Sequence, residues 1–100
     1  MVCFDWAQKE DRSFVWDLNR ETVNILKHGV DFNTASAVFK DPKRKIYVDS
    51  RHSIKEERLF CIGKVGERIL TVRFTYRDGK IRIFGAGYWR KGKVYYEKKD

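Results

Sequence analysis

The spacing of apolar residues predicts a helix near the start of the chain. Between residues 18 and 28, apolar positions recur every three or four residues, which is typical of an amphipathic helix. Asp17 is placed to cap its first turn, and Gly29 to end it. We expect the stripe of Leu18, Thr22, Ile25 and Leu26 to face the core. The opposite side then carries Arg20, Asn24, Lys27 and His28.

A second helix is expected in "TASAVFK", with Asn33 as its N-cap and Asp41-Pro42 just beyond its end. Its apolar side comprises Ala35, Val38 and Phe39. After Pro42 the pattern alternates, which predicts strands in "KIYVD", "ERLFCIGK", "RILTVRFTYR" and "KIRIFGAG". "SFVW" is a further short β-prone stretch, and the tail after Gly87 is compatible with a short C-terminal helix. The chain is therefore read as an α+β domain, with two N-terminal helices on one face of a mostly antiparallel sheet.

The Asp78-Gly79 pair is a strong signal for a two-residue β-hairpin turn. The register that follows pairs Arg77 with Lys80, Tyr76 with Ile81, Thr75 with Arg82, Phe74 with Ile83 and Arg73 with Phe84. Opposed residues share a face, so an apolar face and a basic face are expected. The basic face holds Arg73, Thr75, Arg77, Lys80, Arg82 and Phe84.

Length and composition restrict the class of protein. A chain of 100 residues fits one domain, in which we read residues 1–12 as an extension and residues 13–97 as the folded part. No apolar run is long enough for a membrane span and no signal peptide is apparent, so we expect a cytoplasmic protein. Cys3 and Cys61 lack partners at metal-binding spacing, which predicts neither a disulfide nor zinc.

The charge is informative because it is unbalanced. The 22 lysines and arginines exceed the 14 acidic residues, and the formal net charge is +8. Cations beside aromatic rings suit a phosphate backbone with exposed bases, although a solvated sheet face is the ordinary reading of such a strand. Four cations without an acid among them repel one another, which favours an anion site on this face.

Several segments resemble the BrnT-type toxins of bacterial type II toxin–antitoxin systems. The resemblance lies in "FVWDLNRETVNILKHGVDFNTASAVFKDP", in "EERLFCIGK" and in "FTYRDGKIRIFGAG", and covers about residues 14–97. It implies a RelE-like fold and a metal-independent endoribonuclease that cuts RNA and inhibits translation and growth. It also implies a BrnA-type antitoxin that neutralises the toxin, with operator DNA contacted only through that antitoxin.

The end of the last strand departs from the family pattern. Many members that this chain resembles have Ser-Ala-Arg there, whereas this chain has Gly85-Ala86-Gly87 followed by Tyr88-Trp89-Arg90. Arg90 is a candidate to replace the missing cation.

RNA cleavage by the adjacent 2′-hydroxyl requires charge stabilisation and proton transfer rather than a protein nucleophile. Arginines match two phosphate oxygens at once, so Arg58, Arg77 and Arg82 are the expected charge stabilisers, supported by Lys27. His28, Glu57 and Tyr88 are the candidates for proton transfer, although His28 is equally placed to cap its helix. The expected RNA-binding residues are Arg20, Arg73, Lys80, Phe84, Trp89 and Arg90.

Other functions fit the sequence less well. "GAGYWRKG" is too weak a motif for a nucleotide loop, so neither a cofactor nor a metal is expected. The cations do not lie along one amphipathic helix, which argues against a membrane-surface peptide. The alternative function is a non-catalytic basic module that binds an acidic antitoxin segment or nucleic acid.

Overall fold

The computed structural model describes residues 13–52 and 55–98, so the expected extension at residues 1–12 lies outside the described part. The elements follow the chain as β1 (Phe14–Trp16), α2 (Leu18–His28), α3 (Phe32–Ser36), η1 (Ala37–Lys40), β2 (Lys45–Val48), η2 (Ser50–His52), β3 (Leu59–Val65), β4 (Arg68–Arg77), β5 (Lys80–Gly87) and α4 (Arg90–Glu97). The helix at residues 18–28 and the short C-terminal helix are confirmed.

The strands form one five-stranded sheet in the order β1-β5-β4-β3-β2. β2 to β5 are antiparallel to their neighbours, while β1 adds a parallel edge strand to β5. The α+β class is therefore confirmed, with a mixed sheet. None of the helices in the described part of the chain is long and apolar enough to cross a membrane.

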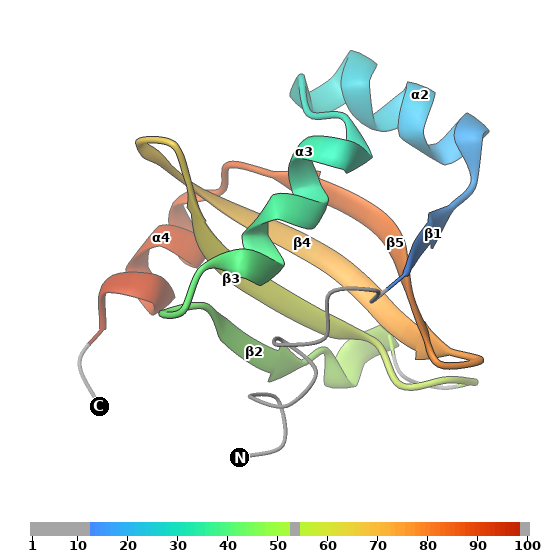
Figure 1. Cartoon of the computed structure of the whole chain (residues 1–100). Coiled ribbons are helices and arrows are strands. Elements are labelled where there is room, and N and C mark those ends of the chain that lie inside the picture. The colour runs from blue at the N-terminus through green and yellow to red at the C-terminus, as the bar shows by residue number, and fades with distance from the viewer. Residues whose placement is uncertain (1–12, 53–54, 99–100) are drawn as a thin grey trace.

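The main hydrophobic core lies between the sheet and the segment formed by α3 and η1. Figure 1 shows this segment crossing one face of the sheet. Ala35, Val38 and Phe39 are buried, as their spacing predicts. The ring of Phe39 meets that of Phe74 on β4 edge to face, with centroids 5.0 Å apart, so apolar burial holds this layer to the sheet.

The expectation that both N-terminal helices cover one face of the sheet is wrong for α2. This helix lies against β5, away from the face that α3 covers (Figure 1). Its expected inward stripe points to solvent, because Leu18 is 71% and Leu26 81% exposed. Asn24 is its buried residue instead. The apolar residues do lie on one side of α2, as predicted, but this side faces solvent and not the core.

Local caps set the ends of these helices. The Asp17 side chain accepts a hydrogen bond from the Asn19 amide, and Gly29 adopts a left-handed conformation with φ of 71°, as predicted. The expected cap at Asn33 is wrong, because Asp31 caps α3 by accepting from the Thr34 amide. Asp31 precedes the helix by one residue, whereas Asn33 is already inside it.

The β4–β5 hairpin has the predicted register from its turn as far as Phe74 and Ile83. Beyond that point a bulge shifts the pairing, so Arg73 lies opposite Gly85 and not opposite Phe84. The turn determines register only near itself, and one extra residue in β5 is enough to change it. Phe84 is that extra residue, and it is 9% exposed.

Helix α4 covers the other face of the sheet at one end. A Cβ atom at Gly92 would lie 2.0 Å from Oγ1 of Thr71, so the helix backbone rests directly on β4. Glycine is unfavourable inside a helix, but at this position its lack of a side chain allows the close approach to β4. The remainder of this face, here called the outer face, is left without a covering helix among the described residues.

Candidate nucleic-acid interface

The outer face carries the basic residues that the hairpin pattern predicts. Thr75 pairs with Arg82 and Arg77 with Lys80, so these four side chains project from the same side of the sheet. Arg73 lies further along β4, beyond the bulge. The expected sorting of the hairpin into an apolar and a basic face is therefore confirmed.

A groove of about 320 Å³ opens where helix α2 meets this face, and is called the α2 groove here. It is lined by Asn19, Arg20, Val23, Asn24, Lys27, His28, Arg73 and Phe84. None of these lining residues is acidic. Arg20, Lys27 and Arg73 also have no carboxylate oxygen within 4 Å in the described part of the chain. The groove thus concentrates positive charge that no carboxylate of the described residues neutralises.

Asn24 fixes the position of α2 relative to the sheet. Its Nδ2 donates to the carbonyls of Val30 and Ala86, both at 2.9 Å, and its Oδ1 accepts from the Ala86 amide at 3.1 Å. The side chain thereby pairs with β5 as a neighbouring strand would, where β1 has already ended. These three hydrogen bonds, called the Asn24 clip here, hold α2 so that Lys27 and His28 line the same groove as Arg73.

An aromatic ring forms part of the groove between two guanidinium groups. The Arg58 guanidinium lies 4.3 Å from the centre of the Phe84 ring, and that of Arg20 lies 5.4 Å from it. Arg58 directly precedes β3 and Arg20 belongs to α2, while the bulge in β5 supplies the ring. Because Phe84 is buried, its ring holds the two guanidinium groups in place by cation–π contacts.

The segment Gly85-Ala86-Gly87 differs from the Ser-Ala-Arg pattern of the toxins that the sequence resembles. Its two glycines leave space for side chains at the groove. A Cβ atom at Gly85 would lie 3.0 Å from Nη2 of Arg73. A Cβ atom at Gly87 would lie 2.8 Å from the Trp89 indole. Arg73 and Trp89 therefore occupy the space over the two positions where the resemblance leads one to expect serine and arginine.

Trp89 borders the groove on the side of His28. The two rings meet edge to face, with centroids 5.1 Å apart. The Trp89 side chain is 37% exposed, so one part of the ring remains available for stacking. His28 is exposed at the end of α2, and no hydrogen bond fixes its ring among the described residues.

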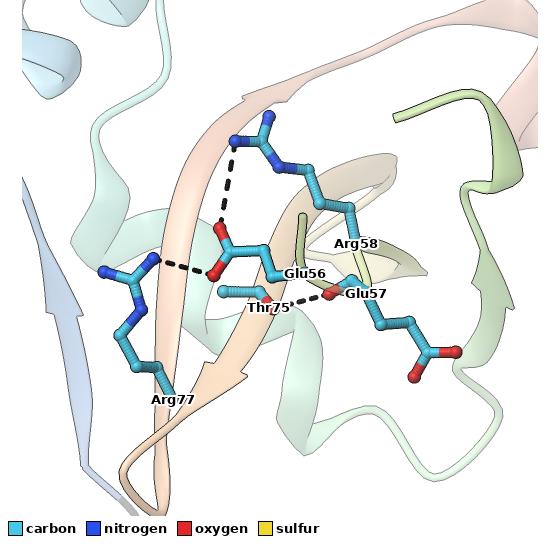
Figure 2. A network of polar contacts seen from close by, with 5 residues as sticks. All are labelled: Glu56, Glu57, Arg58, Thr75 and Arg77. Atoms are coloured by element: carbon cyan, nitrogen blue, oxygen red, sulfur yellow. Dashed lines mark hydrogen bonds and ion pairs between the residues drawn. The ribbon is translucent and has the colours of Figure 1, made fainter. Parts of the chain in front are cut away.

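Near the hairpin turn, the cations are partly neutralised. Figure 2 shows the Glu56 carboxylate between Arg77, at 2.7 Å, and Arg58, at 3.8 Å. The hydrogen bond from Arg77 is the main cause that lowers the pKa of Glu56, and the same bond raises the pKa of Arg77. Arg77 is therefore held by a carboxylate, unlike Arg73.

Two of the expected proton-transfer residues do not reach the α2 groove. The Glu57 side chain points away from the Glu56–Arg58 pair, while its backbone carbonyl accepts from Thr75 Oγ1 at 2.5 Å (Figure 2). Tyr88 packs against the core and stacks under Arg68, whose guanidinium lies 3.6 Å from the ring centre. His28 is thus the one proton-transfer candidate that the structure brings into the groove.

Tyr88 belongs to a second groove of about 460 Å³, called the α4 groove here. It is lined by Lys64, Glu67, Arg68, Ile69, Tyr88, Trp89, Arg90, Lys93 and Glu97. Arg90, the sequence candidate for replacing a lost cation, lies in this groove. Trp89 is the residue shared with the margin of the α2 groove.

Some residues of the α2 groove had no signal in the sequence. Asn24 looked like an exposed polar position, because its partners lie 62 residues away at Ala86. The two glycines did carry a signal, since glycine inside a strand marks a close approach. The sequence could not tell that arginine and tryptophan side chains make that approach.

A small basic α+β domain with an open groove of unneutralised cations and aromatic rings has the features of a protein that binds polyanions. A family model described as the ribonuclease toxin BrnT of type II toxin–antitoxin systems matches residues 16–92. The chain belongs to this BrnT family, which confirms the resemblance found in its sequence. Its family is therefore one of ribonuclease toxins. A search of curated proteins finds no match to the chain.

Proposed function

We propose that this protein is a metal-independent endoribonuclease that cuts RNA in the α2 groove. The toxin would thereby inhibit translation and growth until a BrnA-type antitoxin neutralises it. The observation that carries the proposal is the absence of any carboxylate among the groove's lining residues, beside unpaired cations from α2 and β4. The RelE-like fold that the resemblance implies stays a prediction.

The groove offers complementary contacts to single-stranded RNA. The guanidinium groups of Arg20, Arg58 and Arg73 can each meet two phosphate oxygens. The partly exposed ring of Trp89 provides a face for base stacking, which is tolerant of sequence, while Phe84 is buried beneath Arg20 and Arg58. Lys27 adds a compact ammonium charge on the wall opposite Arg73. Arg82 and Lys80 extend the basic surface towards the hairpin turn, where RNA beyond the cleavage point would run.

In the proposed reaction, the 2′-hydroxyl oxygen attacks the adjacent phosphorus and the bond to the 5′-oxygen breaks. The products are a 2′,3′-cyclic phosphate and a 5′-hydroxyl. His28 accepts the proton of the 2′-hydroxyl or donates one to the leaving 5′-oxygen, because it is the one proton-transfer candidate at the groove, and solvent water exchanges the other proton. Arg73 and Arg58 stabilise the charge that develops on the phosphoryl oxygens, with Lys27 in support, while Arg82, expected in this role from the sequence, binds RNA beyond the cleavage point. Arg77 contributes less than the sequence suggests, since Glu56 holds it.

A second candidate function is a basic module that binds nucleic acid or an acidic antitoxin segment without cutting RNA. The position of Glu57 and Tyr88 outside the α2 groove favours it, because a single proton-transfer residue remains there. The same cations serve both functions. The two differ only in whether bound RNA is cleaved.

The deciding experiment incubates the purified protein with single-stranded RNA in EDTA and analyses the ends of the products. We expect cleavage with 2′,3′-cyclic phosphate ends, and none with Lys27→Ala/His28→Ala. Lys43→Ala is a matched control, because it removes an exposed cation outside both grooves. Intact RNA that binds tightly to the wild type supports the second function. Cleavage that requires added Mg²⁺ contradicts metal independence.

A further inference from the structure

The side of α2 that faces away from the sheet is an exposed apolar surface. The exposed fractions are 71% for Leu18, 81% for Leu26, 44% for Ile25 and 48% for Val23. These are four of the nine large hydrophobic side chains that the described residues expose. Four such residues on one short helix form a continuous patch, which is typical of an interaction surface.

Hydrogen bonds on the polar side of α2 hold its apolar surface towards solvent. A helix of this pattern would normally turn its apolar stripe towards the core. Here the three hydrogen bonds of Asn24 tie the polar side to β5 and Val30. Glu21 adds a further tie, because its carboxylate accepts from the Trp16 indole at 3.1 Å and from the Phe32 amide at 3.0 Å. Rotating the stripe inward would break all of these bonds.

The apolar stripe and the α2 groove are two sides of one helix. Leu18, Ile25 and Leu26 lie on the outward side, while Arg20 and Lys27 line the groove. Val23 belongs to both, since it is exposed and also lines the groove. Any partner that rests on the stripe and extends past Val23 therefore reaches the cations of the groove.

Charge selects among the candidate occupants. A second copy of this chain packed stripe to stripe would bring together two proteins that each carry a net charge of +8. RNA has no apolar side chains to cover leucines. A protein segment with apolar residues on one face and acidic residues beside them satisfies both the stripe and the groove.

We propose that the exposed stripe of α2 is the docking surface for the antitoxin, which in a type II system is a protein. This inference rests on the proposed function, which assigns RNA cleavage to the α2 groove that the antitoxin blocks. The antitoxin contributes apolar side chains against Leu18, Ile25 and Leu26, and acidic side chains that enter the groove beside Val23. Neutralisation then follows from occupation of the groove, and antitoxin and RNA exclude each other.

The test uses the full-length toxin, the antitoxin from the same operon, and the variant Leu18→Gln/Leu26→Gln. Glutamine keeps the helix propensity and size of the position while removing the apolar surface. We expect the antitoxin dissociation constant, measured by calorimetry, to rise roughly 100-fold. Val94→Gln is the matched control, because Val94 is 58% exposed on α4, outside this surface, and its variant should bind like the wild type.

Two outcomes would overturn the docking surface. One is an antitoxin affinity that Leu18→Gln/Leu26→Gln leaves unchanged. The other is wild-type self-association in sedimentation that this variant abolishes while the antitoxin still binds, which would assign the stripe to a second copy. RNA cleavage is measured separately: neither leucine lines the groove, so the variant should cut RNA as the wild type does. Antitoxin binding that depends on the stripe, with no RNA cleavage by either protein, would refute the proposed function alone.

Discussion

The α2 groove and the α4 groove are both basic and open, yet they differ in how their charge is balanced. The α4 groove is larger, at about 460 Å³ against 320 Å³, and its lining has four lysines and arginines. However, Glu67 and Glu97 lie among them. The α2 groove has no acidic lining residue. Unneutralised charge, and not volume, therefore identifies the better site for a polyanion.

The aromatic residues do not separate the two grooves. In the α4 groove, Tyr88 is half-buried, packs against the core and lies under Arg68 at 3.6 Å. In the α2 groove, Phe84 is buried and lies under guanidinium groups at 4.3 and 5.4 Å. Trp89 is partly exposed, lines the α4 groove and meets His28 at the margin of the α2 groove. The balance of charge, and not the aromatic rings, therefore distinguishes the two grooves.

The largest expected effect separates the two grooves directly. Arg73→Ala should lower kcat/KM for RNA cleavage by about 100- to 1,000-fold, as when one preorganised charge stabiliser is removed. Arg68→Ala removes the same charge from the α4 groove and should change kcat/KM by less than about threefold. Steady-state cleavage of a labelled RNA measures both. Equal losses in the two variants would show that the grooves act as one site.

The second prediction concerns the clip that builds the α2 groove. Asn24→Ala should lower the free energy of unfolding by about 2–3 kcal/mol, because three buried backbone groups lose their partner. Urea unfolding measures the change. Asn19→Ala is the control, because Asn19 is exposed on the same helix. An Asn24→Ala protein of wild-type stability would mean that packing alone holds α2 in place.

The third prediction tests the glycine beneath Arg73. Gly85→Ser should lower kcat/KM by about tenfold, because the added side chain displaces the guanidinium from its place. The free energy of unfolding should change by less than about 1 kcal/mol, since the long arginine side chain can move aside. In the Arg73→Ala background, Gly85→Ser should have no further effect on cleavage. An additive loss would instead show that Gly85 acts through the backbone.

The smallest effects are expected at the neutralised cation, Arg77. Glu56→Gln leaves Arg77 without its carboxylate, so RNA affinity should rise slightly and the slope of log K against log salt should steepen by about 0.7. Filter binding at several salt concentrations measures this slope. An unchanged slope would mean that Arg77 does not reach the RNA.

The same pair has a pH dependence with a definite sign. The pKa of Glu56 is lowered in the folded protein by its hydrogen bond from Arg77. The Glu56 carboxylate therefore stabilises the folded state at pH values above its unfolded pKa, which is near 4.5. This stabilisation is lost as the pH falls through the lower pKa of the folded state. Unfolding curves of the wild type and Glu56→Gln should converge as the pH falls from 6 to 3. Curves that stay parallel would contradict the ion pair.

Much of the architecture could be predicted from the sequence, because short-range rules determine it. Asp17 and Gly29 bound α2, and the Asp78-Gly79 turn sets the hairpin register near itself. These features depend on residues a few positions apart, where capping geometry and turn chemistry act alone. The basic face of the hairpin follows from the same alternation.

The tertiary structure decided how α2 is turned and hence where the site is formed. Hydrogen bonds between Asn24 and Ala86, 62 residues apart, outweigh the preference of Leu18 and Leu26 for burial. The bulge at Phe84 and the space over Gly85 then bring Arg73 to face the helix. The sequence determined which residues were available for the groove. Their convergence depends on contacts between distant segments, which local periodicity does not record.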